Sequence, residues 1–257
     1  MYIADGLRPF CLDGDSKIVR ATAPKNTVSN SIIPKLKWMS GALNSSYAAG
    51  YCNWFYQTDK STGDYFWIPP SIKAAGVYAY CDEYFHTWNA PAGMTRGIVN
   101  NAVDVAFIPN DDEAGQIYSN KWNYAMSYPM QGIVIEGHKT FQLDMTALDR
   151  VNVRRLMLYL EKQTYYIAQA FKYESNNEYT RQRFVDQLSE VFDAAVEGFG
   201  VKEYYIKCDE ELNPPEVVDN NELRCKIAVK PVKVVDYIVI DMIATRQSAS
   251  ISEEVMR

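Results

Sequence analysis

Two adjacent stretches with the apolar spacing of a helix constrain this chain most. In residues 149–173 and again in residues 178–199, apolar side chains recur every three or four positions, which predicts two long amphipathic helices. The stripes include Val153, Leu156, Met157, Leu160, Ile167 and Phe171 in the first, and Phe184, Leu188, Val191, Phe192, Ala195 and Phe199 in the second. Because Tyr159 and Tyr166 lie on the far side of the first helix, we expect it to contact neighbours on both sides.

Short β-prone runs surround these helices. They predict strands at residues 46–57, 65–70, 102–109, 130–137, 202–209, 222–231 and 234–245. Two more helices are predicted, at residues 111–123 and at residues 71–84. The latter has Ser71 as its N-cap and Ile72, Ala75, Ala79 and Tyr80 on one side. Since helices and strands mix along the chain, the predicted class is α/β, with α+β as the alternative, and a mixed central sheet is flanked by helices.

The two ends of the chain lack such patterns. Residues 1–45 hold several Gly and Pro residues and no lasting period, so we expect loops and short strands in an irregular arm or the remnant of a preceding region. Residues 46–246 form the predicted core domain, and the small, polar residues 247–257 form a predicted C-terminal arm.

Composition excludes several classes of protein. The formal net charge of −6 argues against a chain-wide basic surface for nucleic acid. No run of 18 apolar residues occurs, so no membrane span is expected, and residues 1–10 lack the pattern of a secretory signal. The cysteines, an odd number without a C-x-x-C pair, favour free thiols in a reducing cytosol; they are Cys11, Cys52, Cys81, Cys208 and Cys225.

Residues suited to catalysis are scarce. His86 and His138 are the only histidines, and neither belongs to a metal-binding pair or a nucleophile motif. The acidic runs at residues 111–113 and 209–211 are better explained as a charged helix start and a solvated turn than as cation sites. We therefore predict no catalytic residue, no metal and no cofactor, and we expect function to reside in surfaces.

A series of short motifs resembles the C-terminal core of contractile-tail sheath proteins, which occur in phages with contractile tails and in related injection particles. The resemblance covers about residues 46–246. It rests on the order of Trp54, Pro69-Pro70-Ser71, Ala75-Gly76, Ala90-Pro91-Ala92-Gly93, Gly137 with Thr140, Val151 to Arg155, and Cys208-Asp209-Glu210. Two features depart from the family. Residues 86–90 replace a glycine-containing approach to the Ala-Pro-Ala-Gly loop, and residues 1–45 are too short for the outer domains of the longer family members.

The resemblance implies a structural subunit of a contractile tail sheath. Such subunits polymerise in hexameric rings as a helical array around an inner tube and contract to drive the tube through the host envelope, without an enzyme activity. The implied partners are other sheath subunits, the inner tail tube protein, and baseplate and terminator proteins, with no nucleic acid and no direct membrane binding. The implied location is the virion tail, assembled in the host cytoplasm.

Three groups of residues follow from the resemblance. Inter-subunit strand exchange is expected at Val235, Tyr237, Val239, Asp241, Ser248, Ser250, Ile251 and Val255. Contact with the tube is expected at Arg181, Arg183, Asp186, Glu190, Asp193 and Glu197. The core motif comprises Trp54, Pro69, Pro70, Ser71, Gly76, Pro91, Gly93, Gly137, Arg154 and Arg155.

Arg155 carries a further expectation, because it opens the first long helix: it should make a charge-assisted contact with an acidic side chain. Two other functions stay open. One is an unrelated phage or capsid-like assembly or scaffold protein of mixed α/β fold. The other is an enzyme with a carboxylate site around Asp82 and Glu83.

Overall fold

A four-stranded sheet organises the N-terminal half of the chain in the computed structural model, which describes residues 1–6 and 32–236. Its order is β1 (Tyr2–Asp5), β2 (Ala48–Tyr51), β6 (Trp122–Tyr128) and β7 (Gly132–Glu136). The pairs β1–β2 and β2–β6 are parallel, and β6–β7 is antiparallel. The sheet is therefore mixed, as the sequence predicts, and β1 is a short strand of the kind expected within residues 1–45.

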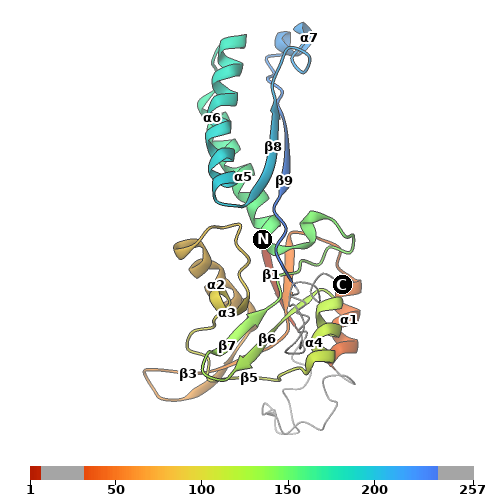
Figure 1. Cartoon of the computed structure of the whole chain (residues 1–257), viewed down its shortest axis with the longest axis vertical. Helices are drawn as coiled ribbons and strands as arrows, with labels where there is room; N and C mark the ends of the chain where they lie inside the picture. The colour runs from red at the N-terminus through yellow and green to blue at the C-terminus, as the bar shows by residue number, and fades with distance from the viewer. Residues whose placement is uncertain (7–31, 237–257) are drawn as a thin grey trace, which may run out of the picture.

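Helices cover both faces of this sheet (Figure 1). Alternate residues of β2 belong to different cores: Ala49 and Tyr51 pack with helix α2 (Pro70–Tyr84), and the partly buried Ala48 packs with α1 (Ile33–Gly41) and α4 (Asp111–Ser119). The mixed fold class and the flanked central sheet are thus confirmed. Helix α1 is a correction within residues 1–45, since Ile33 and Leu36 are buried core residues.

The predicted strand at residues 46–57 is interrupted by a buried asparagine. Asn53 donates a hydrogen bond to the carbonyl of Phe107 at 2.8 Å and accepts one from the amide of Ala125 at 2.9 Å. These bonds end β2, and the chain then enters a second, three-stranded sheet of order β4-β3-β5. Its strands are β3 (Phe55–Thr58), β4 (Tyr65–Ile68) and β5 (Asp104–Val105), so the strand predicted at residues 102–109 is much shorter than expected.

Helix α2 begins one residue before the predicted start and buries a different face. Pro69 occupies the N-cap position, and Ser71 lies in the first turn, where its amide and hydroxyl donate to the carboxylate of Asp5. The buried residues are Pro70, Ala74, Val77, Tyr78 and Cys81. The predicted side was wrong, because Ile72, Ala75, Ala79 and Tyr80 are exposed. The sheet lies against the other side of the helix.

The remaining N-terminal elements are short. Asn110 caps α4 reciprocally with Glu113, and α4 ends at Ser119, so that Trp122 already belongs to β6 rather than to the helix predicted up to residue 123. Helix α3 (Gly93–Arg96) contacts β7. The strand predicted at residues 130–137 is β7.

The C-terminal half forms a separate elongated layer of two helices and a hairpin (Figure 1). A short 3-10 turn, η2 (Ala147–Asp149), leads into α5 (Val151–Ala170), which is followed by α6 (Glu178–Glu197). Strands β8 (Val201–Lys207) and β9 (Lys226–Pro231) pair antiparallel, with α7 (Pro215–Asp219) between them. Most residues of both predicted apolar stripes pack in the shared core with this hairpin; Val153 and Met157 are not part of it, and Phe199 is exposed.

One tryptophan joins the two halves. Trp88, in the loop after α2, packs in the core of α5 and α6 and donates its indole hydrogen to the carbonyl of Gly198 at 2.8 Å. A Cβ atom on Gly200 would lie 2.6 Å from the Trp88 ring, so only glycine permits this approach. His86 stacks on the same ring, with centroids 4.6 Å apart, which makes it a packing residue.

Candidate functional site

The first turn of α5 carries a buried cation that is held by a half-exposed carboxylate. The Nη2 atom of Arg155 lies 2.6 Å from both carboxylate oxygens of Asp82 on α2. The side chain of Arg155 is 7% exposed, whereas that of Asp82 is 45% exposed. The predicted contact of Arg155 with an acidic residue is therefore confirmed, and it couples the C-terminal helices to α2.

A pair of tyrosines packs beneath this arginine: Tyr78 contacts its guanidinium, and Tyr51 is hydrogen-bonded to Tyr78. The Arg155 guanidinium stands over the ring of Tyr78, 4.6 Å from its centroid, and the hydroxyls of Tyr78 and Tyr51 are hydrogen-bonded at 2.8 Å. Burial raises the pKa of Tyr78 to about 12, despite an opposing effect of Arg155. Burial also raises the pKa of Tyr51 well above its usual value. Both phenols stay neutral at physiological pH and act as packing and hydrogen-bonding groups.

Arg154 occupies a different environment, although it is the next residue. Its side chain is buried, it donates to the hydroxyl of Ser46, and its guanidinium stands 4.1 Å from the ring centroid of Tyr47. Its Nε atom has no hydrogen-bond partner among the described residues, and no carboxylate of the described part of the chain pairs with it. A cation–π contact and a hydroxyl therefore replace the usual ion pair.

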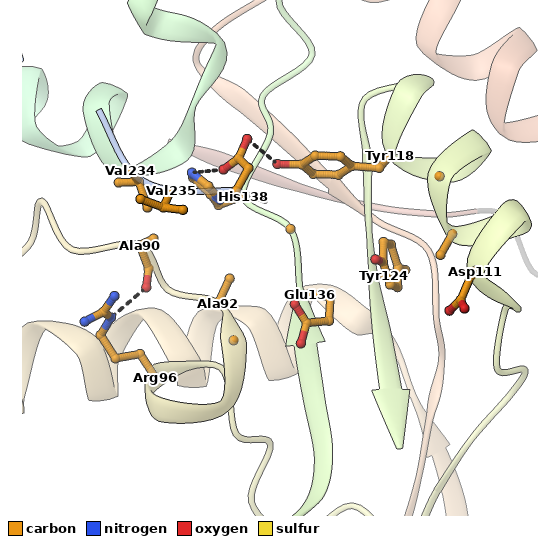
Figure 2. Close-up of a pocket in the computed structure, with 15 residues that line it drawn as sticks. Ala90, Ala92, Arg96, Asp111, Tyr118, Tyr124, Glu136, His138, Val234 and Val235 are labelled. Atoms are coloured by element: carbon orange, nitrogen blue, oxygen red, sulfur yellow. Dashed lines mark hydrogen bonds and ion pairs between the residues drawn. The ribbon is translucent and has the colours of Figure 1, made fainter. Parts of the chain in front are cut away.

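A cavity of about 350 Å³ opens beside the sheet where the described chain ends (Figure 2). The carboxylate of Asp236 lies at its rim, 2.5 Å from the Nη2 atom of Arg150 and 3.7 Å from the Nε2 atom of His138. The Tyr118 hydroxyl donates to the same carboxylate at 3.4 Å. Figure 2 shows Tyr118 and His138 approaching this carboxylate from opposite sides. These contacts fasten residue 236 to α4 and to the start of α5.

The electrostatics of this cavity keep His138 neutral. Burial lowers the pKa of His138 to about 4, and the cations Arg150, Lys139 and Arg96 lower it further against the opposing effect of Asp236. Burial, together with Arg150, lowers the pKa of Lys139 to about 8. The described residues that line the cavity include no Ser, Thr or Cys, and the hydroxyl of Tyr118 donates to the Asp236 carboxylate. The geometry of these contacts suits an anchor.

Three residues of the core motif shape this cavity or its walls. Gly137 has a φ of +87°, and an added Cβ would lie 2.8 Å from the Tyr118 ring, so both conformation and space require glycine. Gly93 lines the cavity and opens α3 with a φ of +79°. Pro91 is buried in the loop before it. Two of these residues, Gly93 and Gly137, line the cavity.

Three of the other motif residues, Pro69, Pro70 and Ser71, lie at the start of α2. Pro69 and Pro70 stand at its N-cap and first position, and Ser71 ties the helix to β1 through Asp5. Trp54 is partly buried and donates to the carbonyl of Gly6 at 3.4 Å. Gly76 differs, because an added Cβ would meet no atom within 4 Å. Packing within the subunit gives no reason for glycine at this position.

Helix α6 presents most of the predicted tube-facing residues to solvent. Arg183, Asp186, Glu190, Asp193 and Glu197 are exposed. Asp193 accepts a hydrogen bond from the Tyr204 hydroxyl at 2.6 Å, and Asp186 accepts one from Gln182 at 2.8 Å. Arg181 corrects the prediction. It is buried and donates to Asn176 at 3.1 Å, because it lies on the side of α6 that packs inside the subunit.

Of the predicted strand-exchange residues, only Val235 is described. It is 72% exposed and lines the cavity next to Asp236, in a segment that is not a strand. Tyr237, Val239, Asp241, Ser248, Ser250, Ile251 and Val255 lie outside the described residues, as does Cys11. Strand exchange stays a prediction.

Sequence reasoning missed Asp5, Asp236 and Tyr118. Asp5 and Asp236 lie inside short β-prone runs and serve as partners for residues that are distant in sequence. No local spacing marks such a role. The only available signal was an acid within an otherwise apolar run, at each end of the chain.

Two classes of site are not found in the described part of the chain. Residues 1–6 and 32–236 contain no group of three or more metal-ligating side chains. Among the same residues, no helix combines the length and the apolar character that a membrane crossing requires.

Known proteins match the chain over most of its length. Residues 144–245 match the family described as phage tail sheath C-terminal domain. The tail sheath protein of Vibrio phage KVP40 is 32% identical over 211 residues, which cover 82% of this chain and 31% of that protein. The tail sheath protein of Enterobacteria phage T4 is 28% identical over 260 residues, which cover 93% of this chain and 39% of that protein. The chain spans about a third of the length of the curated relatives that it matches.

Solved structures share the fold. The sheath complex of an extracellular contractile injection system, PVC, in its contracted state superimposes with a TM-score of 0.73 at 21% identity, covering 84% of this chain and 62% of that chain. A chain of the anti-feeding prophage baseplate gives a TM-score of 0.70 at 18% identity, covering 79% and 56%. Since the matched domain and the curated relatives agree, the chain belongs to the phage tail sheath family, and its residues 144–245 correspond to the C-terminal domain of that family.

Proposed function

We propose that this chain forms the part of a contractile tail sheath that polymerises with copies of itself into a helical array around an inner tube. The observation that carries the proposal is the 32% identity to a phage tail sheath protein over 82% of this chain. The similarity of fold extends over both halves of the chain, because the superposition on the PVC sheath protein covers 84% of it. A structural role also fits the cavity, where Tyr118 and Arg150 hold the Asp236 carboxylate in place.

The proposed partners follow from the family. Copies of the subunit form hexameric rings, the inner tail tube protein lies inside them, and baseplate and terminator proteins bind the two ends. The location would be the virion tail, after assembly in the host cytoplasm. The net charge of −6 supports the absence of a nucleic-acid partner, because phosphate binding depends on basic residues.

A sheet edge supports the proposed exchange of strands. Strand β1 is at the edge of the four-stranded sheet, where its second side has no partner strand among the described residues. An edge of this kind exposes backbone hydrogen-bonding groups that an arm from a neighbouring subunit can pair with. Residues 237–257, which would supply such an arm, follow directly after the Asp236 anchor.

Negative-stain electron microscopy of the purified chain, alone and with the inner tube protein, tests this proposal. We expect long regular tubes or decorated inner tubes. A variant that lacks residues 247–257 is the matched control. It should lose the tubes, while its free energy of unfolding changes by less than about 1 kcal/mol, as for a terminus outside the core. Closed shells would instead favour a capsid-like assembly protein, and folded monomers in every mixture would contradict polymerisation.

A further inference from the structure

Two free cysteines face each other at the tip of the C-terminal hairpin. In the antiparallel pair β8–β9, Lys207 is opposite Lys226, so Cys208 and Cys225 are the next residues beyond the last pair. Opposite residues of antiparallel strands have Cβ atoms about 4.5–5.5 Å apart, close to the separation that a disulfide requires. Both thiols are free and only partly buried. They lie on the side of the hairpin that leads to α7, at the far end of the elongated layer in Figure 1.

The two thiols have unequal chemistry. A hydrogen bond from Cys225 lowers the pKa of Cys208 against the opposing effect of burial, and the guanidinium of Arg181 lowers it further while Asp209 raises it. The same hydrogen bond raises the pKa of Cys225 above its usual range, as does burial. Arg181, whose side chain is turned into the subunit, therefore stabilises the thiolate form of Cys208. The thiolate is the nucleophilic form of cysteine, so the direction of these shifts favours Cys208 as the attacking thiol and Cys225 as the resolving thiol.

A buried asparagine holds the chain beside both cysteines in place. The side-chain amide of Asn213 donates to the carbonyls of Asp209 and Arg224, each at 2.9 Å. Its carbonyl oxygen accepts from the amide of Arg224 at 2.7 Å. Because residues 209 and 224 are the direct neighbours of the two cysteines, this bridge fixes the two backbones before any covalent bond forms. A disulfide here requires no large backbone movement.

The other described cysteines provide an internal comparison. Cys52 is fully buried, and burial moves its pKa above the usual range. Cys81 is buried in the packing side of α2 and points at the carbonyls of His86 and Asn89, and burial raises its pKa as well. No second described thiol is placed opposite either of them by a strand register. Only the hairpin pair combines access, a paired thiol and a thiolate-stabilising cation.

We propose that Cys208 and Cys225 form a reversible dithiol–disulfide site that takes a low-molecular-weight disulfide such as oxidised glutathione as its oxidant. The Cys208 thiolate attacks one sulfur of the oxidant, whose S–S bond breaks and releases one thiolate. Cys225 then loses its proton and attacks the Cys208 sulfur, which releases the second. Two electrons move from the cysteine pair to the oxidant, and the two cysteine protons end on two molecules of glutathione. The new bond closes the loop that carries α7. The site does not depend on the proposed function.

Thiol mapping by mass spectrometry tests this site. The folded wild-type chain is incubated with oxidised glutathione, its free thiols are alkylated after unfolding, and its peptides are analysed. We expect loss of both hairpin thiols and a Cys208–Cys225 cross-linked peptide, while Cys52 and Cys81 stay reduced. Retention of both hairpin thiols, or stable glutathione adducts on both in place of the cross-link, would overturn the proposal.

Single variants test the order of attack. Cys225→Ser should accumulate a mixed disulfide between Cys208 and glutathione, whereas Cys208→Ser should react at least about tenfold more slowly at neutral pH, because Cys225 is the poorer nucleophile. Equal rates would remove the assigned roles. A second measurement, which needs no variant, uses phenylarsine oxide, a reagent that binds two adjacent thiols. It should protect both cysteines of the wild-type chain from alkylation, and a failure to protect them would show that the thiols are not paired.

Discussion

The side chain of Arg155 is buried, whereas the carboxylate that pairs with it is half-exposed, and this difference decides what each residue contributes. Loss of the carboxylate leaves a charge inside the protein, but loss of the arginine leaves a carboxylate that solvent can hydrate. Tyr78 supports the guanidinium from one side only, and the Nη1 atom has no described hydrogen-bond partner. Asp82 therefore contributes to stability mainly by lowering the free-energy cost of burying the Arg155 charge.

Asp82→Ala should accordingly cost more than Arg155→Met. We expect a loss of about 2–3 kcal/mol for Asp82→Ala and about 1 kcal/mol or less for Arg155→Met, which keeps an unbranched apolar stem in place of the buried charge. In the Arg155→Met background, Asp82→Ala should cost close to nothing. Urea unfolding of the four proteins measures the coupling. A single Asp82→Ala variant as stable as Arg155→Met would show that the arginine does not need its partner.

His138 should make stability depend on pH. The folded pKa of about 4 is below the ordinary value of 6.5, so the unfolded chain binds more protons between these values. The stabilisation is present above pH 6.5 and is lost as the pH falls towards 4, by up to about 3 kcal/mol, since each unit of pKa shift corresponds to about 1.4 kcal/mol. His138→Gln removes the titrating group. The two stability curves should diverge across this interval, and parallel curves would refute this account of His138.

At the scale of single residues, the sequence predicted that Arg155 contacts an acidic side chain, but it did not predict which one. The position of Arg155 at a helix start predicted an acidic contact, but Asp82 is 73 positions away in the chain, and only the packing of α2 against α5 selects it. The glycine positions of the predicted motif differ in what the structure requires of them. Gly137 is required by its conformation, and Gly76 has no steric reason within the subunit.

At the scale of elements, α5 and α6 were predictable because each has an apolar stripe at helical spacing, and α6 also has a polar far side. Helix α2 was predicted as an element, but its buried side was not, because apolar residues lie on both sides and only the position of the sheet decides which side is buried. Its exposed side carries Ile72, Gly76, Tyr80 and Tyr84, spaced four residues apart. The strand predicted at residues 46–57 was split for a similar reason, because the contacts of Asn53 are non-local.

Helix α2 permits a matched test of its glycine. Gly76→Ala should stabilise the subunit by about 0.5–1 kcal/mol, because alanine favours a helix and its Cβ meets no atom within 4 Å. Gly137→Ala is the contrasting control and should destabilise it by about 2–4 kcal/mol, since both space and φ exclude a side chain. Thermal and urea unfolding give both values. Destabilisation by Gly76→Ala would mean that α2 is packed more closely than its exposed side indicates.

Helix α6 offers a test of the proposed tube contact. Glu190 and Glu197 are exposed, one above the other on the helix, and no described contact engages them, unlike Asp186 and Asp193. Reversing both to lysine should weaken binding to the inner tube on the order of tenfold, because exposed charge pairs contribute modestly each. Glu161→Lys on the exposed side of α5 is the control. Co-sedimentation with the tube measures binding, and equal binding by the two variants would exclude this face of α6.

At the scale of the whole molecule, the chain consists of a sheet lobe and a helix–hairpin layer that meet through Trp88, Arg155 and Asp236. The order of motifs predicted the family, and the mixed class followed from the alternation of helices and strands. The junction could not be predicted, because it joins residues from α2, α5 and the end of the described chain. Such long-range pairs leave no periodic pattern in a single sequence.

Cryo-electron microscopy of the polymer that the chain forms on the inner tube tests the central claim most directly. A helical reconstruction should show a continuous sheath with rings of six subunits, in which the fold described above is repeated at every position and the exposed side of α6 faces the lumen. Folded subunits that form closed shells, or that remain as single molecules beside undecorated tubes, would contradict the assignment of this chain as a sheath subunit.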